Sequence, residues 1–510
     1  MKKLTSLLFL CFAGNIANVQ AEKRPNILLF LVDDMGWQDT SVPFWNQKTA
    51  NNEIYETPNM ERLAGKGMKF TQAYANSVSS PSRVSLFTGM NSVCHRVTNW
   101  TLERNVSTDG QNDSLIYPRW NVNGFCQQDK IERCTYATSL AQVLKDNGYY
   151  TIHCGKAHFA ARTTPGENPL NLGFNINING GAAGAPGSYL GVANFGNACN
   201  GRQSNVFAVP GLEEYYGKDI FLTEALTLEA IKALDKVKQE DKPFFLYMSH
   251  YAIHVPLEKD MRFYEKYKKK GLVDNEAAYA ALIEGMDKSL GDLMSYLESN
   301  GLMDNTIILF MSDNGGLASE TYWRAQQYVQ NAPLSSGKGS AHEGGIREPM
   351  IVYWPDVTHP GSECDKYLIM EDFFPSILEM AQIRHYRTVQ HVDGVSFVPL
   401  LKGNGDPSRN RALYWNFPNG WGQPGPGFGA SCTIRKGDWK MIYYYGSGKK
   451  ELFNIAEDIS EKNNLVEDFP DIVRKLSKEL GVYLRKKDAQ RPFLKATGEA
   501  IPWPDEVKNR

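Results

Sequence analysis

The chain has 510 residues, of which 42% are hydrophobic and 22% charged, and its formal net charge is −2. This composition is typical of a globular protein long enough for one large domain and a smaller one. The near-neutral charge gives no reason to expect nucleic acid or an anionic membrane surface as a partner. An anionic ligand would therefore have to be bound by a local cluster of cations.

The first 21 residues have the pattern of an export signal. Two lysines precede an apolar run over residues 4–13, and a small-residue cleavage site ends at Ala21. The apolar run is too short to span a bilayer, and no later segment has the pattern of a membrane span. We therefore expect an exported protein, periplasmic or secreted. Lipidation at Cys11 is a less favoured alternative, because Leu10 fits that motif poorly.

The cysteines are scattered without C-x-x-C spacing, which argues against a zinc site. Because Cys11 lies in the signal, seven of the eight cysteines remain, and at least one thiol must stay unpaired. Export would permit disulfides. Cys126 and Cys134 are the most local candidate pair.

Buried strands alternate with amphipathic helices over the first two-thirds of the chain. Helices are predicted to begin at Pro58, to end at Gly148, and to cover 222–237 and 282–297. Alternation of this kind predicts an α/β fold, with a large, mostly parallel sheet sandwiched by helices. Its strands are predicted over 26–32, 149–154, 244–248 and 306–311.

Beyond about residue 400, short strands and turns replace this alternation. We predict a smaller antiparallel sheet with strands over 412–415, 432–435, 439–445 and 451–453, followed by a helix over 471–485. The chain is thus divided into a signal peptide (1–21), an N-terminal α/β domain (22–400) and a C-terminal α+β subdomain (401–510). Two glycine-rich stretches, 179–201 and 419–430, are too long for turns and are either binding loops or disordered.

Two of the predicted strands end in acidic and amide residues. Asp33 and Asp34 follow the strand over 26–32, and Asp313 and Asn314 follow the strand over 306–311. Ligands of such sheets bind beyond the carboxyl ends of the strands. One aspartate at a strand end is usually a cap, but two acidic ends in one sheet favour a metal. Oxygen-only ligation suits Ca²⁺, with Mg²⁺ second, better than Zn²⁺.

A serine and an arginine share one face of a predicted helix. The run Ser79-Ser80-Pro81-Ser82-Arg83 is continued by L-F-T-G. Residues i and i+4 are neighbours on a helix, so Ser79 lies next to Arg83. The N-terminus of a helix also favours negative charge. Ser79 is therefore the candidate nucleophile, whereas Ser80 and Ser82 lack this spacing.

Further lysines and histidines follow the other predicted strands. Lys156 and His158 follow the strand over 149–154, His254 follows the strand over 244–248, and Lys338 lies in S-G-K-G. Each alone would most often be a solvated loop residue. Together with Arg83 they would place three cations and two imidazoles around one metal. That combination suits a tetrahedral oxyanion and its leaving group.

In this order, the motifs resemble those of the type I, formylglycine-dependent sulfatases of the alkaline-phosphatase superfamily. The resemblance covers nearly all of the mature chain. It rests on Asp-Asp, S-x-P-S-R with L-F-T-G, G-K-x-H, H-x-P, S-D-N-G-G and G-K-x-x-x-x-E-G-G-x-R, and on the C-terminal R-K-G-D-W-K. Each motif is weak alone, but six in order are specific. The resemblance implies an alkaline-phosphatase-like fold and hydrolysis of sulfate esters.

The resemblance also implies a role for each matching residue. Ser79 would be converted to formylglycine (3-oxoalanine), whose hydrate attacks sulfur and is stabilised by Arg83. Lys156 and Lys338 would bind the sulfate oxygens. The two histidines would move protons, His254 to the departing alcohol and His158 in the release of sulfate. The implied calcium ligands are Asp33, Asp34, Ser79, Asp313 and Asn314.

The residue at the modified position is serine, where many family members carry cysteine. The serine form occurs in bacteria and is matured by an anaerobic-type sulfatase-maturing enzyme. The resemblance therefore implies a bacterial host and such an enzyme as a partner. Without that maturation, Ser79 stays a bare serine and activity should be very low.

The main alternative is a phosphate-ester or phosphonate hydrolase of the same superfamily, although the context S-x-P-S-R-x-x-x-x-T-G favours sulfate. A non-catalytic glycan-binding relic is disfavoured because no motif position is lost.

Export and the family resemblance suggest a sulfated glycan as the substrate, with galactose, N-acetylgalactosamine or N-acetylglucosamine sulfate as leading candidates. Tryptophans near the motifs could stack on the sugar or pack in the core, namely Trp100, Trp323, Trp415 and Trp421. The residues expected to recognise the sugar are His95, Arg96, Asn99, Trp100, His250 and Arg347.

Overall fold

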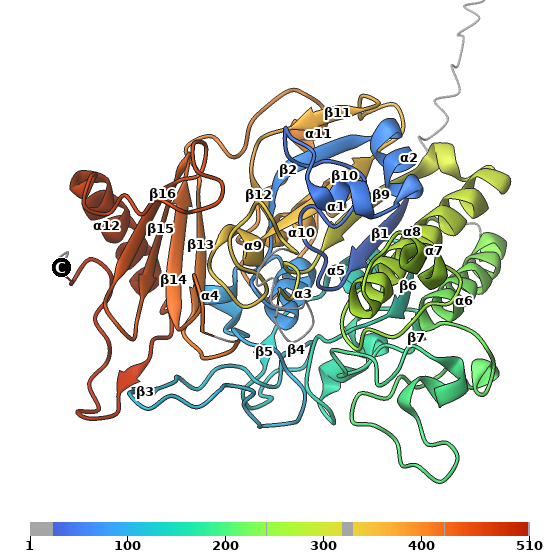
Figure 1. Cartoon of the computed structure of the whole chain (residues 1–510), viewed down its shortest axis with the longest axis horizontal. Coiled ribbons are helices and arrows are strands. Elements are labelled where there is room, and N and C mark those ends of the chain that lie inside the picture. The colour runs from blue at the N-terminus through green and yellow to red at the C-terminus, as the bar shows by residue number, and fades with distance from the viewer. Residues whose placement is uncertain (1–23, 241, 319–329, 423, 508–510) are drawn as a thin grey trace, which may run out of the picture.

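A mixed sheet of nine strands dominates the computed structural model, which describes residues 24–240, 242–318, 330–422 and 424–507 (Figure 1). The predicted export signal, Cys11 and Trp323 lie outside the described residues. The strand order is β11-β2-β10-β9-β1-β8-β6-β7, and β12 pairs with β2. The bounds are β1 Asn26–Val32, β2 Met68–Tyr74, β6 Tyr150–Gly155, β7 Ile176–Ile178, β8 Phe244–Ser249, β9 Thr306–Ser312, β10 Arg347–Tyr353, β11 Ser362–Cys364 and β12 Leu368–Ile369.

The four strands predicted from apolar runs lie side by side and parallel. β1 pairs with β8 on one side and β9 on the other, with Leu29 opposite Tyr247 and Leu309. β6 pairs with β8 on its far side. Helices cover both faces, which explains why these strands read as continuous apolar runs. The predicted α/β class with a large, mostly parallel sheet is therefore confirmed.

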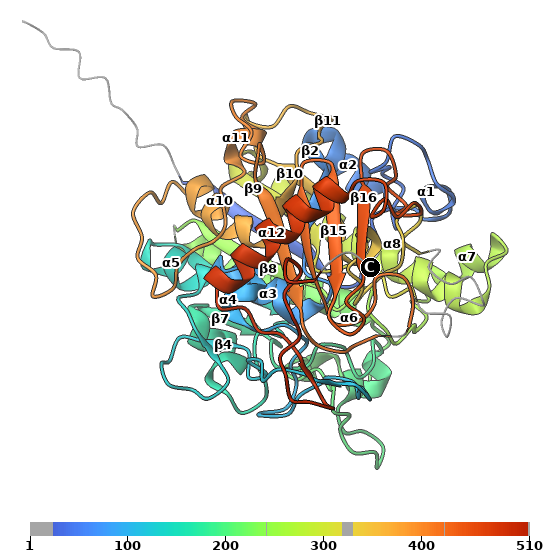
Figure 2. The same ribbon diagram turned by 90° about the vertical axis from the view of Figure 1, so that its left-hand side faces the viewer.

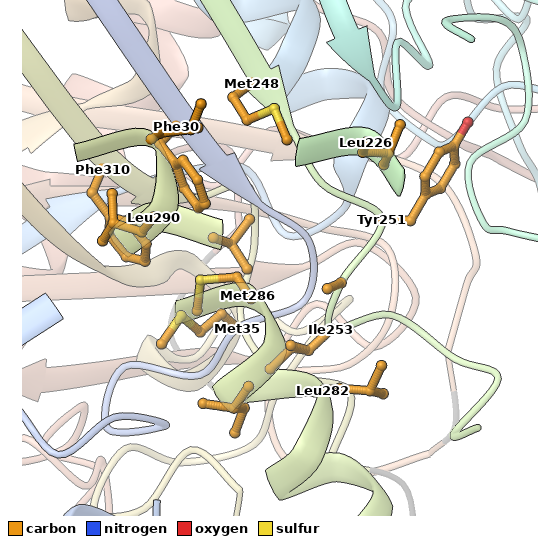
Figure 3. Packing of buried hydrophobic residues seen from close by; sticks show 14 of the residues in the cluster. Phe30, Met35, Leu226, Met248, Tyr251, Ile253, Leu282, Met286, Leu290 and Phe310 are labelled. Carbon is orange, nitrogen blue, oxygen red and sulfur yellow. The ribbon is translucent and has the colours of Figure 1, made fainter. Parts of the chain in front are cut away.

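Alternate residues of β1 belong to different hydrophobic clusters. Phe30 packs on one face of the sheet with residues of α2, α6 and α8. Figure 3 shows this side, where Phe30 lies near Phe310 and Leu290. Leu29 faces the other cluster, which includes residues of α3, α5, α10 and α11. Burying each such side chain contributes about 1.5–3 kcal/mol.

The helices of this part of the chain have the following bounds: α1 Ala50–Ile54, α2 Pro58–Lys66, α3 Ser79–Thr88, α4 Ser92–His95, α5 Leu140–Asp146, α6 Leu222–Val237, α7 Tyr264–Lys269, α8 Asp274–Ser299, α9 Glu343–Ile346, α10 Phe373–Met380 and α11 Val398–Leu401.

The C-terminal part forms a second, smaller sheet, which is antiparallel. Its strands are β13 Ala412–Phe417, β14 Ser431–Lys436, β15 Trp439–Tyr444 and β16 Lys450–Asn454. Helix α12 (Pro470–Lys486) lies across it, as Figure 2 shows, and buries Leu476, Leu480 and Leu484 against the strands. This confirms the predicted C-terminal sheet plus helix. The predicted division after residue 400 falls within α11, before this sheet begins.

Strands β2 and β10 were not predicted, and they make the large sheet mixed. β10 runs antiparallel to both β2 and β9. Its sequence begins with Arg-Glu-Pro, so only four residues remain for the apolar run by which a buried strand is predicted. β2 mixes polar with apolar residues, and its Lys69 and Gln72 are only half-buried. No helix among the described residues is long and apolar enough to cross a membrane.

Two short strand pairs tie loops together. β3 (Leu115–Ile116) pairs with β17 (Phe493–Leu494), and β4 (Phe125–Cys126) pairs with β5 (Thr135–Tyr136). The second pair brings the candidate cysteines together, because the Sγ atoms of Cys126 and Cys134 lie 3.3 Å apart. Both are free thiols here.

Candidate active site

The carboxyl ends of β1, β6, β8 and β9 meet at one edge of the large sheet. Asp33 and Asp34 leave β1 there, Asp313 leaves β9, and Lys156 leaves β6. All four side chains are buried. The strand order places β1 between β8 and β9, so residues far apart in sequence become neighbours.

Each buried aspartate is paired with a cation. Lys156 Nζ lies 2.6 Å from Asp33 Oδ2, and Lys338 Nζ lies 2.6 Å from Asp34 Oδ1. The third pair joins Arg83 to Asp313, with 2.7 Å from Nη2 to Oδ2. Buried charges are tolerated only when they are paired or bound to a metal. The pairing therefore brings the predicted cations and the predicted metal ligands together in one site.

Ser79 is the first residue of α3, and its side chain points into this cluster. Its Oγ lies 3.0 Å from Lys156 Nζ and 3.2 Å from both Asp33 Oδ1 and Asn314 Oδ1. The neighbouring serines have other partners. Ser80 contacts Thr101, and Ser82 contacts the main chain at the start of the helix. The i+4 spacing thus selected the serine that the fold places in the site.

Arg83 is fully buried behind Ser79. Its Nη1 donates to Ser249 Oγ (2.5 Å), Tyr247 Oη (3.1 Å) and the Lys156 carbonyl (3.2 Å). Burial disfavours the charged guanidinium, but Tyr247 and Asp313 outweigh that penalty and raise the pKa of Arg83 above its usual value. Arg83 is therefore a fixed positive charge.

The predicted metal ligands offer only oxygen donors. Besides the three aspartates, Asn314 directs its Oδ1 toward Ser79, while its Nδ2 donates to Asp34 Oδ1 at 2.8 Å. Burial raises the pKa of Asp33 to about 8 despite the attraction of Lys156. Desolvation thus opposes the charged form of Asp33, and a divalent cation bound beside it would favour that form. The residues fit a hard cation such as Ca²⁺.

Two histidines stand at the entrance to the cluster. His254 Nδ1 donates to the Val255 carbonyl at 2.8 Å, so its Nε2 faces Asp34 Oδ2 at 3.6 Å. This nitrogen lies among the atoms of Asp33 and Asp34 that could hold a metal. His158 Nε2 donates to the Thr101 carbonyl at 2.8 Å, and its Nδ1 has no partner. Burial lowers the pKa of both rings, that of His254 to about 3.

A cavity of about 420 Å³ opens onto these groups. The predicted catalytic residues Ser79, His158, His254 and Lys338 line it, and so does Trp100. Both glycine-rich stretches contribute to its wall, the first through residues 184–187 and the second through Trp421. The sequence predicted that these stretches are either binding loops or disordered, and their place in the cavity wall favours binding loops.

Two further lining residues, Asn205 and Phe207, were missed by the sequence analysis, and they lie just beyond the first glycine-rich stretch. The only sequence signal for them is their closeness to a predicted loop. Val255 and Pro256, which belong to the quoted H-x-P motif, also line the cavity.

The other residues expected to recognise the sugar do not line the cavity. His95 is buried under α3, where its Nε2 contacts Ser85 Oγ at 3.0 Å. Arg96 points away and pairs with Asp488 at the surface. Asn99 is buried and donates to Asp109 Oδ1 at 2.9 Å. The structure therefore does not place these three at the cavity, and of this segment Trp100 lines it.

His250 and Arg347 also belong to other parts of the structure. His250 is buried between Ser289, 2.8 Å from its Nε2, and the ring of Phe30. Arg347 stacks over Trp37, with 4.4 Å from its Cζ to the ring centroid, and lines a separate cavity. Trp415 donates its Nε1 to the Ala75 carbonyl and is a core residue.

Comparison with known proteins agrees with this geometry. Residues 25–383 match the sulfatase family, and residues 337–488 match the C-terminal region described for N-sulphoglucosamine sulphohydrolase. The chain belongs to the sulfatase family. Family members of this kind hydrolyse sulfuric esters, and this sulfatase is therefore a sulfuric ester hydrolase.

Three proteins resemble this sulfatase over 90% or more of their own length. It is 27% identical to a sulfatase of Formosa agariphila, over 100% of this chain and 99% of that protein. It is 26% identical to the N-acetylgalactosamine-6-sulfatase of Canis lupus familiaris, over 93% and 90% of the two chains. The crystal structure of Ps i-CgsB in complex with k-i-k-neocarrahexaose has a TM-score of 0.70 with 26% identity, and covers 91% of this chain and 93% of that chain.

Proposed function

We propose that this sulfatase removes sulfate esters from sulfated glycans, after Ser79 has been converted to formylglycine. The leading substrates are sulfates of galactose, N-acetylgalactosamine or N-acetylglucosamine. The observation that best supports this proposal is the position of Ser79. Its Oγ lies 3.0 Å from Lys156 Nζ inside a cluster of three cations, and Ser79 lines an open cavity. The names of the dog enzyme and of the carrageenan-type oligosaccharide complex support a sugar as the substrate.

Calcium would be held by Asp33, Asp34, Asp313 and Asn314, with the group at position 79 beside them. The ion would supply charge stabilisation for the anionic transition state. Formylglycine hydrate would supply one hydroxyl to attack sulfur and a second that lets sulfate leave by elimination.

The lysines and arginine of the chain hold the sulfate end of the substrate. Lys156 and Lys338 donate to sulfate oxygens, since both ammonium groups flank the cluster and Lys338 also lines the cavity. Arg83 is held behind Ser79 and keeps the local potential positive. Charge-assisted contacts of this kind stabilise the charge that develops as the S–O bond breaks.

The two histidines move protons at opposite ends of the reaction. His254 is assigned to the departing alcohol oxygen through Nε2, because Nδ1 already donates to the Val255 carbonyl, and Asp34 Oδ2 at 3.6 Å from Nε2 would stabilise a proton there. His158 accepts a proton at Nδ1, the nitrogen left without a partner, when sulfate is released. His158 is held in this tautomer by the Thr101 carbonyl.

We also propose that the protein is exported, to the periplasm or the outside of a bacterial cell, and that an anaerobic-type maturing enzyme modifies Ser79. The charged and apolar pattern of residues 1–21 supports export. The serine at position 79 supports that class of maturing enzyme.

The test is expression with and without such a maturing enzyme. Mass spectrometry of the peptide that contains Ser79 should show a species two hydrogens lighter only with the enzyme. The matured protein should then release sulfate from an aryl sulfate much faster than phosphate from the matching aryl phosphate. Faster release of phosphate, or of phosphonate, would favour the rival superfamily activity instead.

A further inference from the structure

Trp421 lies beside one of the two sulfate-binding lysines. Lys338 Nζ is 5.7 Å from the centroid of its ring. The ring also packs against the main chain at Gly339, where a Cβ would lie 2.6 Å from Cε3 of Trp421. Gly339 has φ +89°, so a side chain there is excluded by both space and backbone conformation. The glycine at position 339 therefore leaves the space that the indole of Trp421 occupies beside the cavity.

The loop that carries Trp421 is fastened on both sides. Asn419 is buried, accepts from Thr98 Oγ1 at 2.5 Å and donates to Asp109 Oδ2 at 3.1 Å. Farther along the loop, the Gly427 carbonyl accepts from Ala341 N at 2.9 Å. These bonds join the β13–β14 loop of the C-terminal sheet to the segments around α4 and α9. A platform fixed in this way loses little conformational entropy when a ligand stacks on it.

The rest of the cavity wall is aromatic, small or neutral. Trp100 and Phe207 line it together with the segment 184–187, and Asn205 adds one amide. Among the described residues that line the cavity, the side chains that can carry charge are Lys338, His158 and His254, all assigned to the sulfate ester. No described lining residue therefore offers a charge partner to the part of the substrate beyond the ester oxygen.

We infer that this sulfatase selects a sugar ring that carries one sulfate and is otherwise uncharged, and that Trp421 is the surface on which the ring stacks. The inference deepens the proposed function and rests on it. A second sulfate or a carboxylate on that ring would lose its hydration against the aromatic wall without gaining a cation from the lining residues that the structure describes. A neutral ring keeps the gain from apolar contact and satisfies its hydroxyls with Asn205 and water.

The experiment compares three matured variants with the wild-type enzyme. Trp421→Ala removes the platform, and Trp421→Phe keeps a flat ring. Trp354→Ala is the matched control, because Trp354 is also half-buried and also has a lysine near its ring, Lys402 Nζ at 5.5 Å, but does not line the cavity. The substrates are 6-sulfated galactose, N-acetylgalactosamine and N-acetylglucosamine, with N-acetylgalactosamine 4,6-disulfate as the doubly charged ring.

Trp421→Ala should raise KM for the best monosulfated sugar by about tenfold, with a smaller change in kcat, and Trp421→Phe should recover most of that loss. Inhibition by inorganic sulfate should change by less than about twofold, because the cations that bind sulfate remain in place. Wild-type enzyme should prefer the monosulfated over the disulfated ring by at least about tenfold in kcat/KM. The Trp354→Ala control should match wild type.

Two results would overturn the inference. One is a Trp421→Ala enzyme with the same KM for sugar sulfates as the Trp354→Ala control. The other is equal or faster turnover of the disulfated ring. Failure of the proposed function looks different, because matured wild-type enzyme would then release no sulfate even from an aryl sulfate; that result would remove the inference as well.

Discussion

Arg83 and Asp313 form a fully buried ion pair, with Nε and Nη2 of the arginine 2.9 and 2.7 Å from the same carboxylate oxygen. The pair joins the nucleophile helix to the end of β9. It therefore couples the position of Ser79 to the metal-binding end of the sheet.

Loss of one partner of this pair should be costly. Arg83→Ala should abolish sulfate release and lower the free energy of unfolding by about 3–5 kcal/mol, because it leaves Asp313 buried without its partner. Urea unfolding monitored by circular dichroism measures the change. Arg96→Ala, which removes an exposed pair with Asp488, should cost at most about 1 kcal/mol and leave activity unchanged. Similar losses in the two variants would contradict this account.

Only one of the three clustered serines should be needed for activity. Ser79→Ala should abolish turnover and the modified peptide, since its Oγ alone faces Lys156 and Asp33. Ser80→Ala should keep most activity, because Ser80 contacts Thr101 instead. The measurement is the steady-state rate of sulfate release by the Ser79→Ala and Ser80→Ala variants, each expressed with the maturing enzyme. An active Ser79→Ala enzyme would assign the nucleophile to another residue.

Removal of the divalent cation should affect both stability and activity. Chelation should lower the melting temperature, and added Ca²⁺ should restore it in proportion to the logarithm of its concentration above Kd. The cause is that the cation would bind the site that Asp33, Asp34 and Asp313 form in the folded protein, and not the unfolded chain. Calorimetry of the matured protein with and without chelator is the measurement. Asp313→Asn should weaken the calcium effect, whereas an unchanged melting temperature on chelation would argue against a metal.

Buried histidines should make the protein less stable in acid. Burial lowers the pKa of His95, His153 and His250 to about 3 each. In the unfolded chain the pKa of a histidine is about 6.5. Between pH 6.5 and about 3, these three histidines therefore bind protons in the unfolded state but not in the folded state. The free energy of unfolding should therefore fall as pH drops from about 6.5 toward 3, by up to about 1.4 kcal/mol per pH unit for each ring.

His250→Gln tests this dependence, since the amide can still contact Ser289. It should flatten the decline of stability with falling pH, measured by denaturant unfolding at a series of pH values. His391→Asn is the control, because the His391 side chain is 81% exposed. An equal slope in wild type and His250→Gln would show that other groups govern the acid loss.

The thiols of Cys126 and Cys134 should form a disulfide under oxidising conditions. Their Sγ atoms lie 3.3 Å apart, and the hydrogen bond from Cys134 lowers the pKa of Cys126 to about 7, which favours the reactive thiolate. The short loop between them predicts a gain of about 2–3 kcal/mol in unfolding free energy. Mass spectrometry of the unreduced protein detects the bond. Cys94→Ser should not change the result, but Cys134→Ser should abolish it.

Much of the fold could be predicted because its central strands are buried on both faces. A strand such as β1 has no polar face, so its sequence is a continuous apolar run that ends abruptly at Asp33. β2 and β10 could not be predicted as easily, because partial burial in one and Arg-Glu-Pro at the start of the other weaken that signal. The residues of the buried cluster could be predicted where they directly follow strand ends, as Asp33, Lys156 and Asp313 do, or where they have the i+4 spacing of Ser79 and Arg83.

The sequence by itself determined which residues gather in the buried cluster, since Ser79, Arg83, Lys156 and Lys338 lie in short motifs whose local geometry depends on neighbours in the chain. Only the tertiary structure decided which residues meet the rest of the substrate. His95 and Trp100 lie in one short segment, yet the first packs against Ser85 and the second faces the cavity. Trp421 reaches the site only because the C-terminal sheet packs beside α4 and α9. Such long-range contacts depend on how the sheets and loops pack, and no local pattern encodes them.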